Sequence, residues 1–326
     1  MSDYNRLKNG ILGFIIGDAM GVPLEFTKRR TEKVVDMLEY GTHHMPKGSW
    51  SDDSSMVVAT IESIIDNKGN INYENIMNNF ILWVEKGKFT SNNKTFGIGR
   101  TTLRALRNYY YKEKFEIYKN PLMCGIDDIK DNGNGSLMRI LPIAYYCYYK
   151  KLTEEEIYKL VKDISSMTHK HNISILGCYI YVLFVIGILN GKEKKDIYKS
   201  IREYNYNKYF NKETINNYSK VLDNDISLLD IDNINSSGYV VNTLEAVIWC
   251  FMNSNNYNES IIEAINLGDD VDTIGALVGG ISGSYYNEIN NKWLKDIKRK
   301  DYLLDLCNKY YEVLKFKKKI KIHQHF

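Results

Sequence analysis

Two short segments of the chain combine acidic and hydroxyl side chains at a spacing that suits metal binding. The segment GSWSDDSSM at positions 48–56 holds Ser51, Asp52 and Asp53, and the segment GDDVDT at positions 268–273 holds Asp270, Asp272 and Thr273. A hydroxyl oxygen beside two carboxylates forms the hard oxygen cluster that Mg²⁺ prefers. An EF-hand calcium loop is excluded for the second segment, because its D-x-[DN]-x-[DN]-G register is absent.

Each of these segments precedes an apolar helical pattern, which offers a second interpretation. Ser51 is a competent N-cap, and acidic residues in a first turn favour the positive end of the helix dipole. One such segment is typical of helix capping, whereas two of the same kind favour the two halves of one site. Four carboxylates brought together would repel unless cations neutralised them, and two Mg²⁺ ions would do so.

Glycines recur every four residues beside both acidic regions. They are Gly13, Gly17 and Gly21 in GILGFIIGDAMGVPLEF, and Gly275, Gly279 and Gly283 after the second acidic segment. At this spacing they share one helix face and allow a neighbouring backbone to approach closely. Asp18 interrupts the first apolar run, Pro23 stops its helix and Glu25 lies in the loop beyond. Solvated acids at a helix end are the alternative interpretation of Asp18 and Glu25.

Another segment combines glycines with the start of a helix. In DNGNGSLMRILP, Gly133 and Gly135 bracket Asn134. Free backbone N–H groups at such a loop suit a diphosphate, and a plain Asn-Gly turn is the alternative. Arg139 is available for an acid in the core or for a phosphate. A smaller loop of this kind, FGIGRTT, spans Phe96–Thr102.

His169 lies in SSMTHKHN between two helical patterns, where it and Thr168 are placed to contact a ligand. With His171 it forms an H-x-H pair, which is a weak indication of zinc, and a loop histidine without a metal is the more common case. The pairs His43–His44 and His323–His325 have no neighbouring pattern that indicates a function.

The hydrophobic pattern is helical almost throughout and predicts an all-α protein. Four prolines leave little to interrupt the helices. We predict a single domain over residues 1–326, a polar surface insertion at 203–237, and a basic, solvated tail at 315–326 with a phosphate-binding arm as its alternative. The predicted helices cover Met56–Ile65, Ile76–Val84, Thr102–Tyr111, Leu137–Tyr149, Glu155–Met167, Ile175–Leu189, Thr243–Met252, Ser260–Leu267, Ile274–Tyr286 and Tyr302–Phe316.

Composition limits the class of protein further. An apolar fraction of 44%, a charged fraction of 25% and a net charge of +3 are those of an ordinary globular protein without a strong pull towards nucleic acid or membranes. The longest apolar run, Ile175–Leu189, is short of the roughly 20 residues that span a bilayer, so it predicts a buried core helix. Five dispersed cysteines without a C-x-x-C pair indicate a reducing compartment. With no signal-peptide pattern, we expect a cytoplasmic protein, or one of the host cytoplasm if its source is a virus or parasite.

Five of these motifs stand in an order that resembles the ADP-ribosylglycohydrolase family. That family includes the dinitrogenase-reductase-activating hydrolases and the ADP-ribosylarginine and ADP-ribosylserine hydrolases. The motifs are GDAMGVPLEF, WSDDSSM, GNGSLMRILP, SSMTHKH and GDDVDTIGALVGGISGSYY. They run from about Gly10 to Tyr286, so the resemblance covers most of the chain.

The resemblance implies a compact orthogonal all-α domain whose central cleft binds two Mg²⁺ or Mn²⁺ ions. It implies that Glu25 guards or activates the site. The candidate catalytic residues are Glu25, Asp53 and Asp270, and the general base stays open between an aspartate and Glu25 acting through a water. The implied metal ligands are Ser51, Asp52, Asp53, Asp270, Asp272 and Thr273. The implied substrate-binding residues are Gly99, Gly133, Asn134, Gly135, Ser136 and His169.

The chain departs from the family pattern at a few positions. Ser51 and Ser54 stand where threonine is usual, which preserves both hydroxyl oxygens. Asp269 stands where a second glycine is usual, which adds a carboxylate next to the expected metals. The stretch Lys130–Asn132 also differs from the family, so substrate contacts there do not follow from the resemblance.

The resemblance implies hydrolysis of the glycosidic bond that joins ADP-ribose to a protein side chain or a small acceptor. The expected partner is an ADP-ribosylated protein or conjugate, and we expect a monomer that binds neither nucleic acid nor a membrane. Two alternatives are a non-catalytic ADP-ribose-binding relative and another Mg²⁺-dependent nucleotide hydrolase of helical fold. Glu154–Glu156 do not supply the E-x-x-E pairs of the latter. The acceptor stays open among arginine, serine, poly(ADP-ribose) and O-acetyl-ADP-ribose.

Overall fold

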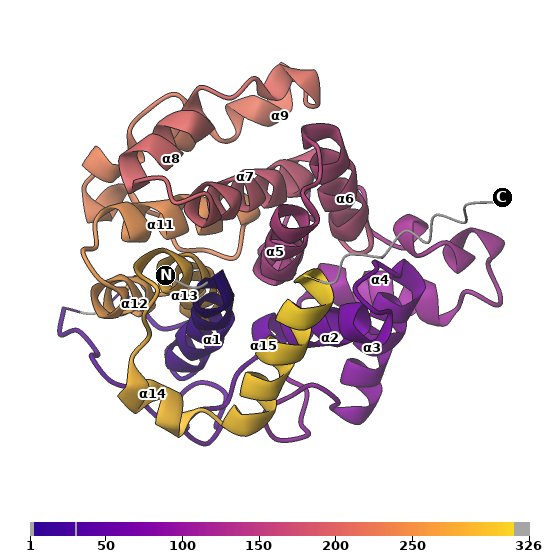
Figure 1. Ribbon diagram of the computed structural model, residues 1–326, viewed down its shortest axis with the longest axis horizontal. Coiled ribbons are helices and arrows are strands. Elements are labelled where there is room, and N and C mark those ends of the chain that lie inside the picture. The colour runs from indigo at the N-terminus through magenta and orange to yellow at the C-terminus, as the bar shows by residue number, and fades with distance from the viewer. Residues whose placement is uncertain (1–2, 30, 316–326) are drawn as a thin grey trace, which may run out of the picture.

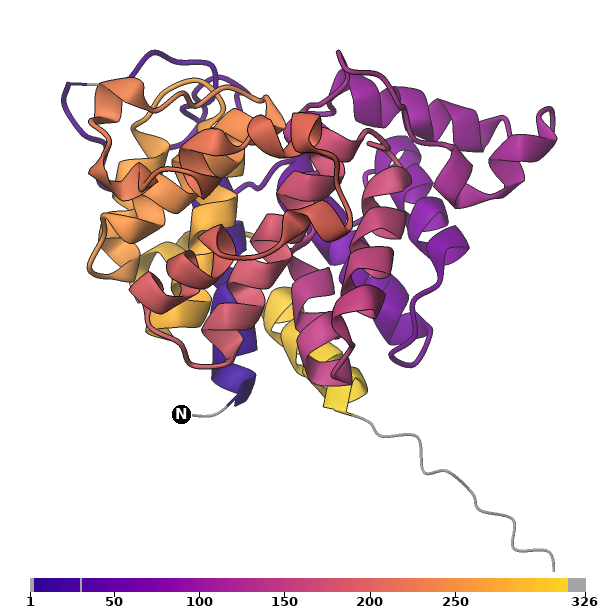
Figure 2. The ribbon, with the colours of Figure 1, turned by 90° about the horizontal axis from the view of Figure 1, so that it is seen from above.

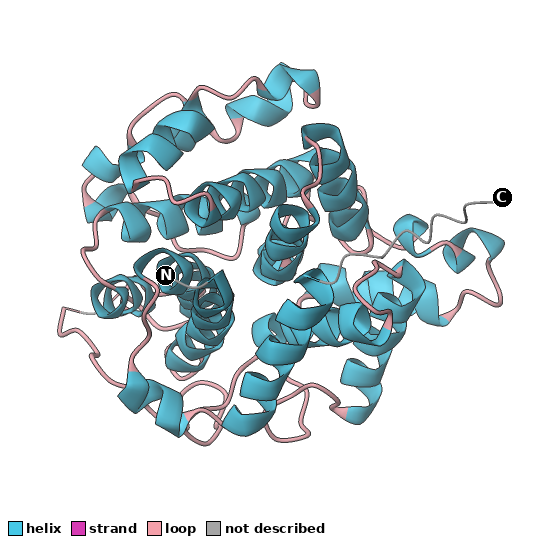
Figure 3. Cartoon of the chain, viewed as in Figure 1, coloured by secondary structure: helices cyan, strands magenta, loops and turns pink. Residues whose placement is uncertain are grey.

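The structure, a computed structural model, describes residues 3–29 and 31–315, which form helices joined by loops (Figure 1). No β-strand occurs within these ranges (Figure 3), and isolated β-bridges join only single pairs of residues. The prediction of an all-α fold is therefore confirmed. The predicted basic tail lies outside the described residues except for Lys315.

The α-helices are α1 (Asp3–Gly21), α2 (Asp52–Asp66), α3 (Tyr73–Lys86), α4 (Arg100–Tyr110), α5 (Leu141–Lys150), α6 (Glu154–Ser166), α7 (Asn172–Leu189), α8 (Lys194–Arg202), α9 (Lys212–Asn216), α10 (Ser219–Leu222), α11 (Val240–Met252), α12 (Tyr257–Ile265), α13 (Val271–Tyr286), α14 (Asn291–Asp296) and α15 (Lys300–Lys315). Short 3₁₀ helices are η1 (Glu116–Lys119), η2 (Pro121–Met123), η3 (Asn134–Arg139), η4 (Tyr206–Lys208), η5 (Ile226–Leu228) and η6 (Ile231–Asn233).

The two glycine-striped helices, α1 and α13, lie side by side (Figure 1). A methyl group added to Gly13 would lie 2.6 Å from the carbonyl oxygen of Gly279, and one added to Gly275 would lie 2.6 Å from that of Gly17. Only glycine permits such close backbone contact. The contacts run in opposite order along the two helices, so the pair is antiparallel. The end of α1 therefore meets the start of α13. This contact brings the segment with Asp18 and Glu25 next to the acidic segment at 268–273, although the two are distant in sequence.

One predicted helix, Leu137–Tyr149, is divided in the structure. The 3₁₀ helix η3 ends at Arg139, and α5 begins at Leu141 with Pro142 in its first turn. Proline lacks the N–H that an internal helix position donates, so a new helix starts at this point. The other predicted helices are present with ends shifted by a few residues.

Short helices that the hydrophobic pattern did not reveal are α8, α9, α10 and α14. The predicted insertion at 203–237 contains two of these together with η4, η5 and η6. It also contributes side chains to the core, among them Tyr218 and Ile226, which are fully buried. Whether this segment is an insertion stays a prediction.

The most apolar helix, α7, runs through the core. By length and composition it is the one helix in the described ranges that qualifies as a membrane span, but 78% of it is buried inside the molecule. It packs against α5, α6 and α11. The prediction of a core helix is thus confirmed, and α7 supplies the apolar wall behind the loops described next.

Candidate active site

Three α-helices begin at one small cavity. The first turns of α2, α4 and α13 all contribute to its wall, and its volume is about 250 Å³. The positive ends of three helix dipoles therefore meet there, which favours an anionic ligand. The predicted site residues that line this cavity are Glu25, Asp52, Asp53, Gly99, Gly133, Asn134, Gly135, His169, Asp270, Asp272 and Thr273.

A group of carboxylates gathers at this cavity. One oxygen each of Glu25, Asp270 and Asp272 lies within 4.8 Å of the other two, and all three residues are buried. Among the described residues, no lysine or arginine forms an ion pair with them; Glu25 instead contacts the ring of His43. Buried like charges without a cationic partner are unfavourable, so the arrangement calls for bound cations.

The electrostatics of the carboxyl groups lead to the same conclusion. Burial raises the pKa of Asp270 to about 6, and Glu25 nearby adds to this shift. Burial and then neighbouring carboxylates raise the pKa values of Asp52, Asp53 and Asp272 well above the usual range. In addition, Oδ1 of Asp53 is buried without a hydrogen-bond partner in the described structure. A set of hard oxygen donors with an unpaired member fits a divalent cation such as Mg²⁺ or Mn²⁺.

The first acidic half is held from behind by Asp18. Its carboxylate accepts hydrogen bonds from the backbone N–H groups of Ser51 and Ser54, each at 3.0 Å, and from the Ser54 hydroxyl at 2.5 Å. Asp18 is fully buried and Glu25 is nearly so, and the interpretation of these residues as solvated acids is therefore wrong. Burial raises the pKa of Asp18 to about 6 against the opposing effect of these hydrogen bonds.

Ser51 caps α2, as the sequence predicts, because its hydroxyl accepts a hydrogen bond from the Asp53 N–H at 3.3 Å. The same hydroxyl donates to Oδ2 of Asp53 at 3.0 Å. Ser51 does not line the cavity and instead lies one step behind it, between Asp18 and Asp53. Ser51 thus both caps α2 and contacts the acidic cluster through Asp53.

The second acidic half is held by backbone contacts. Asp269 has a positive φ of 63°, a conformation that glycine adopts more readily. Its N–H donates to the carbonyl of Thr27 at 2.8 Å, and its carbonyl accepts from the N–H of Phe26 at 2.7 Å. This isolated bridge fixes the Glu25 loop against Asp270.

The glycine loop before η3 completes the cavity. The Asn134 side chain donates to Oδ2 of Asp270 at 2.5 Å and to the Thr243 hydroxyl at 2.9 Å. Ser136 does not line the cavity; its side chain is fully buried, 2.9 Å from the hydroxyl of Ser165. Among the predicted substrate-binding residues, Ser136 is therefore the one that the structure places outside the wall.

His169 lines the cavity, but His171 does not join it in a metal site. His171 caps α7, and its ring accepts from the side-chain N–H of Asn132 at 3.0 Å. The acidic triad is the one group of three or more metal-binding side chains within the described ranges, and it contains no histidine. Arg139 forms no ion pair with an acid among the described residues and does not line the cavity. It is buried and donates to the Thr168 hydroxyl at 2.8 Å.

Sequence reasoning missed three residues of this region. His43 contacts Glu25 and packs on the ring of Phe96 with centroids 5.1 Å apart. Gly97, with a positive φ of 81°, passes so close to Asp52 that an added methyl group would overlap the carboxylate. Phe26 is 66% exposed at the cavity mouth. The sequence carried a signal only for Gly97, which lies in the FGIGRTT loop. His43 could not be identified in this way, because its position depends on tertiary contacts.

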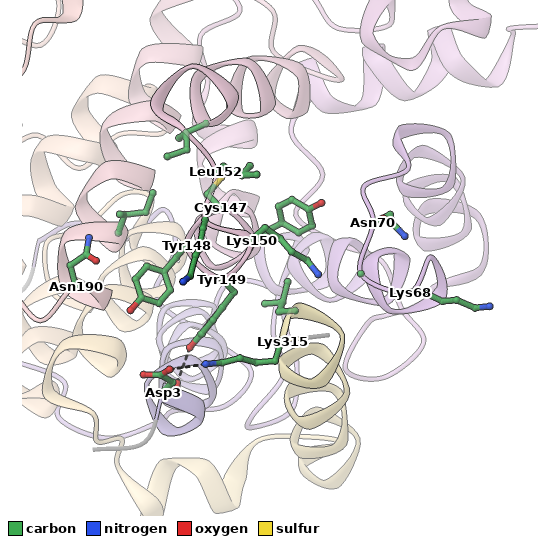
Figure 4. Close-up of a pocket in the computed structure, with 16 residues that line it drawn as sticks. Asp3, Lys68, Asn70, Cys147, Tyr148, Tyr149, Lys150, Leu152, Asn190 and Lys315 are labelled. Carbon is green, nitrogen blue, oxygen red and sulfur yellow. Dashed lines mark hydrogen bonds and ion pairs between the residues drawn. The ribbon is translucent and has the colours of Figure 1, made fainter. Parts of the chain in front are cut away.

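A larger cavity, of about 1140 Å³, lies elsewhere and has different chemistry (Figure 4). It is bordered by the first residue described, Asp3, and the last, Lys315, which form an ion pair at 2.9 Å. These ends of α1 and α15 share one edge of the molecule (Figure 2), whereas the acidic cavity lies beyond the other end of α1. Tyrosine and lysine side chains dominate its wall without an acidic cluster, so the smaller cavity is the candidate active site.

Comparison with known proteins gives consistent results. The ADP-ribosylglycohydrolase family model matches residues 1–319. ADP-ribosylarginine hydrolase Tri1 of Pseudomonas putida (strain GB-1) is 28% identical, over 94% of this chain and 78% of that protein. The ADP-ribosyl-[dinitrogen reductase] glycohydrolase of Rhodospirillum rubrum is 25% identical, over 92% of each chain. A solved structure described as an ADP-ribosylglycohydrolase-related protein complex superposes with a TM-score of 0.78 at 23% identity, over 96% of this chain and 99% of that one, and shares the fold.

Proposed function

Since this chain belongs to the ADP-ribosylglycohydrolase family and is a glycosyl hydrolase of ADP-ribose linkages, we propose that it removes ADP-ribose from arginine side chains with two divalent metal ions. The buried acidic cluster without a cationic partner is the observation that carries the metal dependence. The arginine acceptor is supported by two relatives named ADP-ribosylarginine hydrolase, at 28% and 26% identity.

The residues that would hold the cations come from both acidic halves. Asp52 and Asp53 lie in the first turn of α2, and Asp272 and Thr273 lie in the first turn of α13, with Asp270 just before it. Ser51 would contribute through Asp53, to which its hydroxyl is bonded. When bound, divalent cations neutralise the carboxylates and polarise the oxygen atoms of the sugar.

The chain itself would bind and orient the rest of the ligand. The N-termini of α2, α4 and α13 offset the negative charge of a diphosphate. Asn134 is held by Asp270 and Thr243, so the loop that carries it is fixed before a ligand arrives. Gly99, Gly133 and Gly135 keep this part of the wall free of side chains.

Glu25 is the residue that we propose as general base. Its carboxylate lies beside Asp270 and Asp272 at the cavity and is kept in place by His43. From there it would take a proton from the water that attacks C1 of the distal ribose. The bond between this C1 and the arginine nitrogen breaks through an oxocarbenium-like state. The arginine nitrogen would leave with the electron pair of the C1–N bond and would then take up the proton that Glu25 had removed from the water, which restores the Glu25 carboxylate.

We also propose that the enzyme acts in a reducing compartment, the cytoplasm. All five cysteines are buried and free, and none is paired with another. Proteins with this use of cysteine are typical of compartments that keep thiols reduced.

Release of free ADP-ribose from a panel of conjugates tests the proposal. Proteins modified on arginine and on serine, poly(ADP-ribose) and O-acetyl-ADP-ribose should be compared with Mg²⁺ and with EDTA. Release from the arginine conjugate alone, lost in EDTA, is the expected result. Release from serine conjugates instead would reject the arginine acceptor, and full activity in EDTA would reject the metal ions.

A further inference from the structure

Arg139 has an unusual environment at the end of η3. It is fully buried, and no carboxylate among the described residues pairs with it. Its Nη2 donates to the carbonyl of Ile164 at 2.9 Å and to Oγ1 of Thr168 at 2.8 Å. Nε and Nη1 have no hydrogen-bond partner in the described structure, and the guanidinium lies 5.1 Å from the ring centroid of Phe80. Burial lowers the pKa of Arg139 to about 10, so it stays charged at neutral pH.

The hydrogen bonds of Arg139 determine the direction of the next one. A guanidinium only donates, so Oγ1 of Thr168 must accept from it. The single hydroxyl proton of Thr168 then needs an acceptor. Nδ1 of His169, 2.9 Å from Oγ1, is the remaining polar atom within hydrogen-bond distance among the described residues.

This geometry distinguishes the two neutral forms of the imidazole. If Nδ1 accepts from the Thr168 hydroxyl, the ring proton is on Nε2. If Nδ1 carried the proton, both it and Arg139 would donate to Oγ1, and the hydroxyl proton of a fully buried threonine would have no acceptor. The first arrangement gives the hydroxyl proton of Thr168 an acceptor, and the second does not.

Nε2 of His169 is directed towards the glycine loop of the cavity. A methyl group added to Gly135 would lie 3.2 Å from Nε2, and one added to Gly133 would lie 3.8 Å from it. No described residue forms a hydrogen bond with Nε2, and His169 lines the cavity wall. A proton on Nε2 is therefore available to a ligand oxygen, whereas a lone pair there would repel one.

We propose that Arg139 and Thr168 act as positioning residues that fix His169 as its Nε2–H tautomer, a neutral donor to an oxygen of ADP-ribose. The identity of the ligand rests on the proposed function, but the tautomer does not. Burial and then the charge of Arg139 lower the pKa of His169 to about 3, which keeps the ring uncharged at physiological pH. The bulky ring also explains the glycine at position 135, because an added methyl would lie 2.7 Å from Cε1 of His169.

The tautomer is measured in the ligand-free protein with ¹⁵N NMR of the histidine ring nitrogens, using His169→Gln to assign the signals. The wild type should show a protonated Nε2 and an unprotonated Nδ1. Thr168→Val removes the hydroxyl at nearly constant volume and should give a mixture of the two forms. Thr168→Ser keeps the hydroxyl and should restore the wild-type signals. A protonated Nδ1 in the wild type, or an unchanged ring in Thr168→Val, would overturn the proposal.

Calorimetric titration with ADP-ribose supplies the second measurement. Thr168→Val should weaken the affinity about 10-fold, as loss of a partner behind a ligand-binding group does, and Thr168→Ser should recover most of it. Equal affinity of the wild type and Thr168→Val would overturn the role in binding. If no variant binds ADP-ribose, the proposed function fails, and the NMR result still decides the tautomer.

Discussion

The two acidic halves of the site have similar residues but different supports. At the start of α2, the Ser51 hydroxyl caps the helix and the buried Asp18 carboxylate accepts backbone and hydroxyl hydrogen bonds of Ser51 and Ser54. At the start of α13, the cap residue Asp270 makes no side-chain capping bond. The first half is thus supported by a buried acid behind it, whereas the second half is anchored by the Asp269 backbone bridge, and its Asp270 carboxylate accepts from the Asn134 side chain at the cavity.

Asp270→Asn should give the largest effect on activity and no loss of stability. It removes one carboxylate from the acidic triad, and we expect ADP-ribose release to fall by at least about 100-fold, with the metal-induced rise in Tm lost. The metal-free protein should be as stable as the wild type or more so, because a buried like charge is removed. Initial rates with Mg²⁺ and Tm in EDTA measure both. A large fall of Tm in EDTA would contradict the contrast between the halves.

Asp18→Asn should affect both stability and metal binding. The new amide N–H₂ group would face the backbone N–H of Ser51, which lies close to both oxygens of the native carboxylate, and this buried mismatch should cost about 1–3 kcal/mol in the free energy of unfolding. We expect the affinity for Mg²⁺ to fall about 10-fold, since the support of a ligand-bearing turn is lost. Denaturant unfolding and metal titration measure these effects. Asp270→Asn is the matched control. Equal stability of the two variants would contradict the proposed difference between the supports of the two acidic halves.

The pH dependence of stability should come from both halves. The folded-state pKa values of Asp18 and Asp270 are raised to about 6, above the ordinary value of 3.8. Between about pH 4 and pH 6 the folded state therefore binds more protons than the unfolded state, and its stability falls as pH rises through this window. We expect Tm in EDTA to decrease from pH 4 to pH 7. Asp18→Asn and Asp270→Asn should each make this decrease smaller. A Tm that rises over the window would contradict these shifts.

Asp269→Gly should give the smallest change and should be stabilising. The positive φ of Asp269 suits glycine, and a gain of up to about 1 kcal/mol in the free energy of unfolding is expected. Its backbone bridge to Thr27 does not need the side chain, so ADP-ribose release should be retained. Chemical denaturation against wild type measures the gain, with Asp269→Asn as the control that keeps the strained conformation. A destabilised glycine variant would indicate a role for the carboxylate.

Local sequence patterns predicted the parts of the site that follow from one segment at a time. The cap at Ser51, the helix starts behind both acidic motifs and the glycine stripes are such features, because each depends on neighbouring residues. The stripes also indicated a close helix pair, although not which helices form it. Pro142 marked the division between η3 and α5, but the apolar pattern concealed it.

Residues whose role depends on distant partners were not predictable in this way. Asp18 resembles any acid near a helix end in the sequence. Its hydrogen-bond partners Ser51 and Ser54 lie 33 and 36 residues further along the chain. His43 has its role only because its loop folds onto Glu25. Ser136 follows the glycine loop in sequence, yet 3₁₀ geometry turns its side chain into the core.

The antiparallel contact of α1 with α13 also has a consequence for synthesis of the protein. During translation α1 emerges long before α13, and the surface that buries its glycine face is made only when α13 follows. A nascent chain must keep this apolar helix unpartnered for most of its elongation, a state that exposes it to aggregation and to chaperones. The high contact order of the pair also predicts slow folding. Catalysis can therefore begin only after α13 has left the ribosome, because a chain truncated before α13 lacks Asp272 and Thr273 of the cavity.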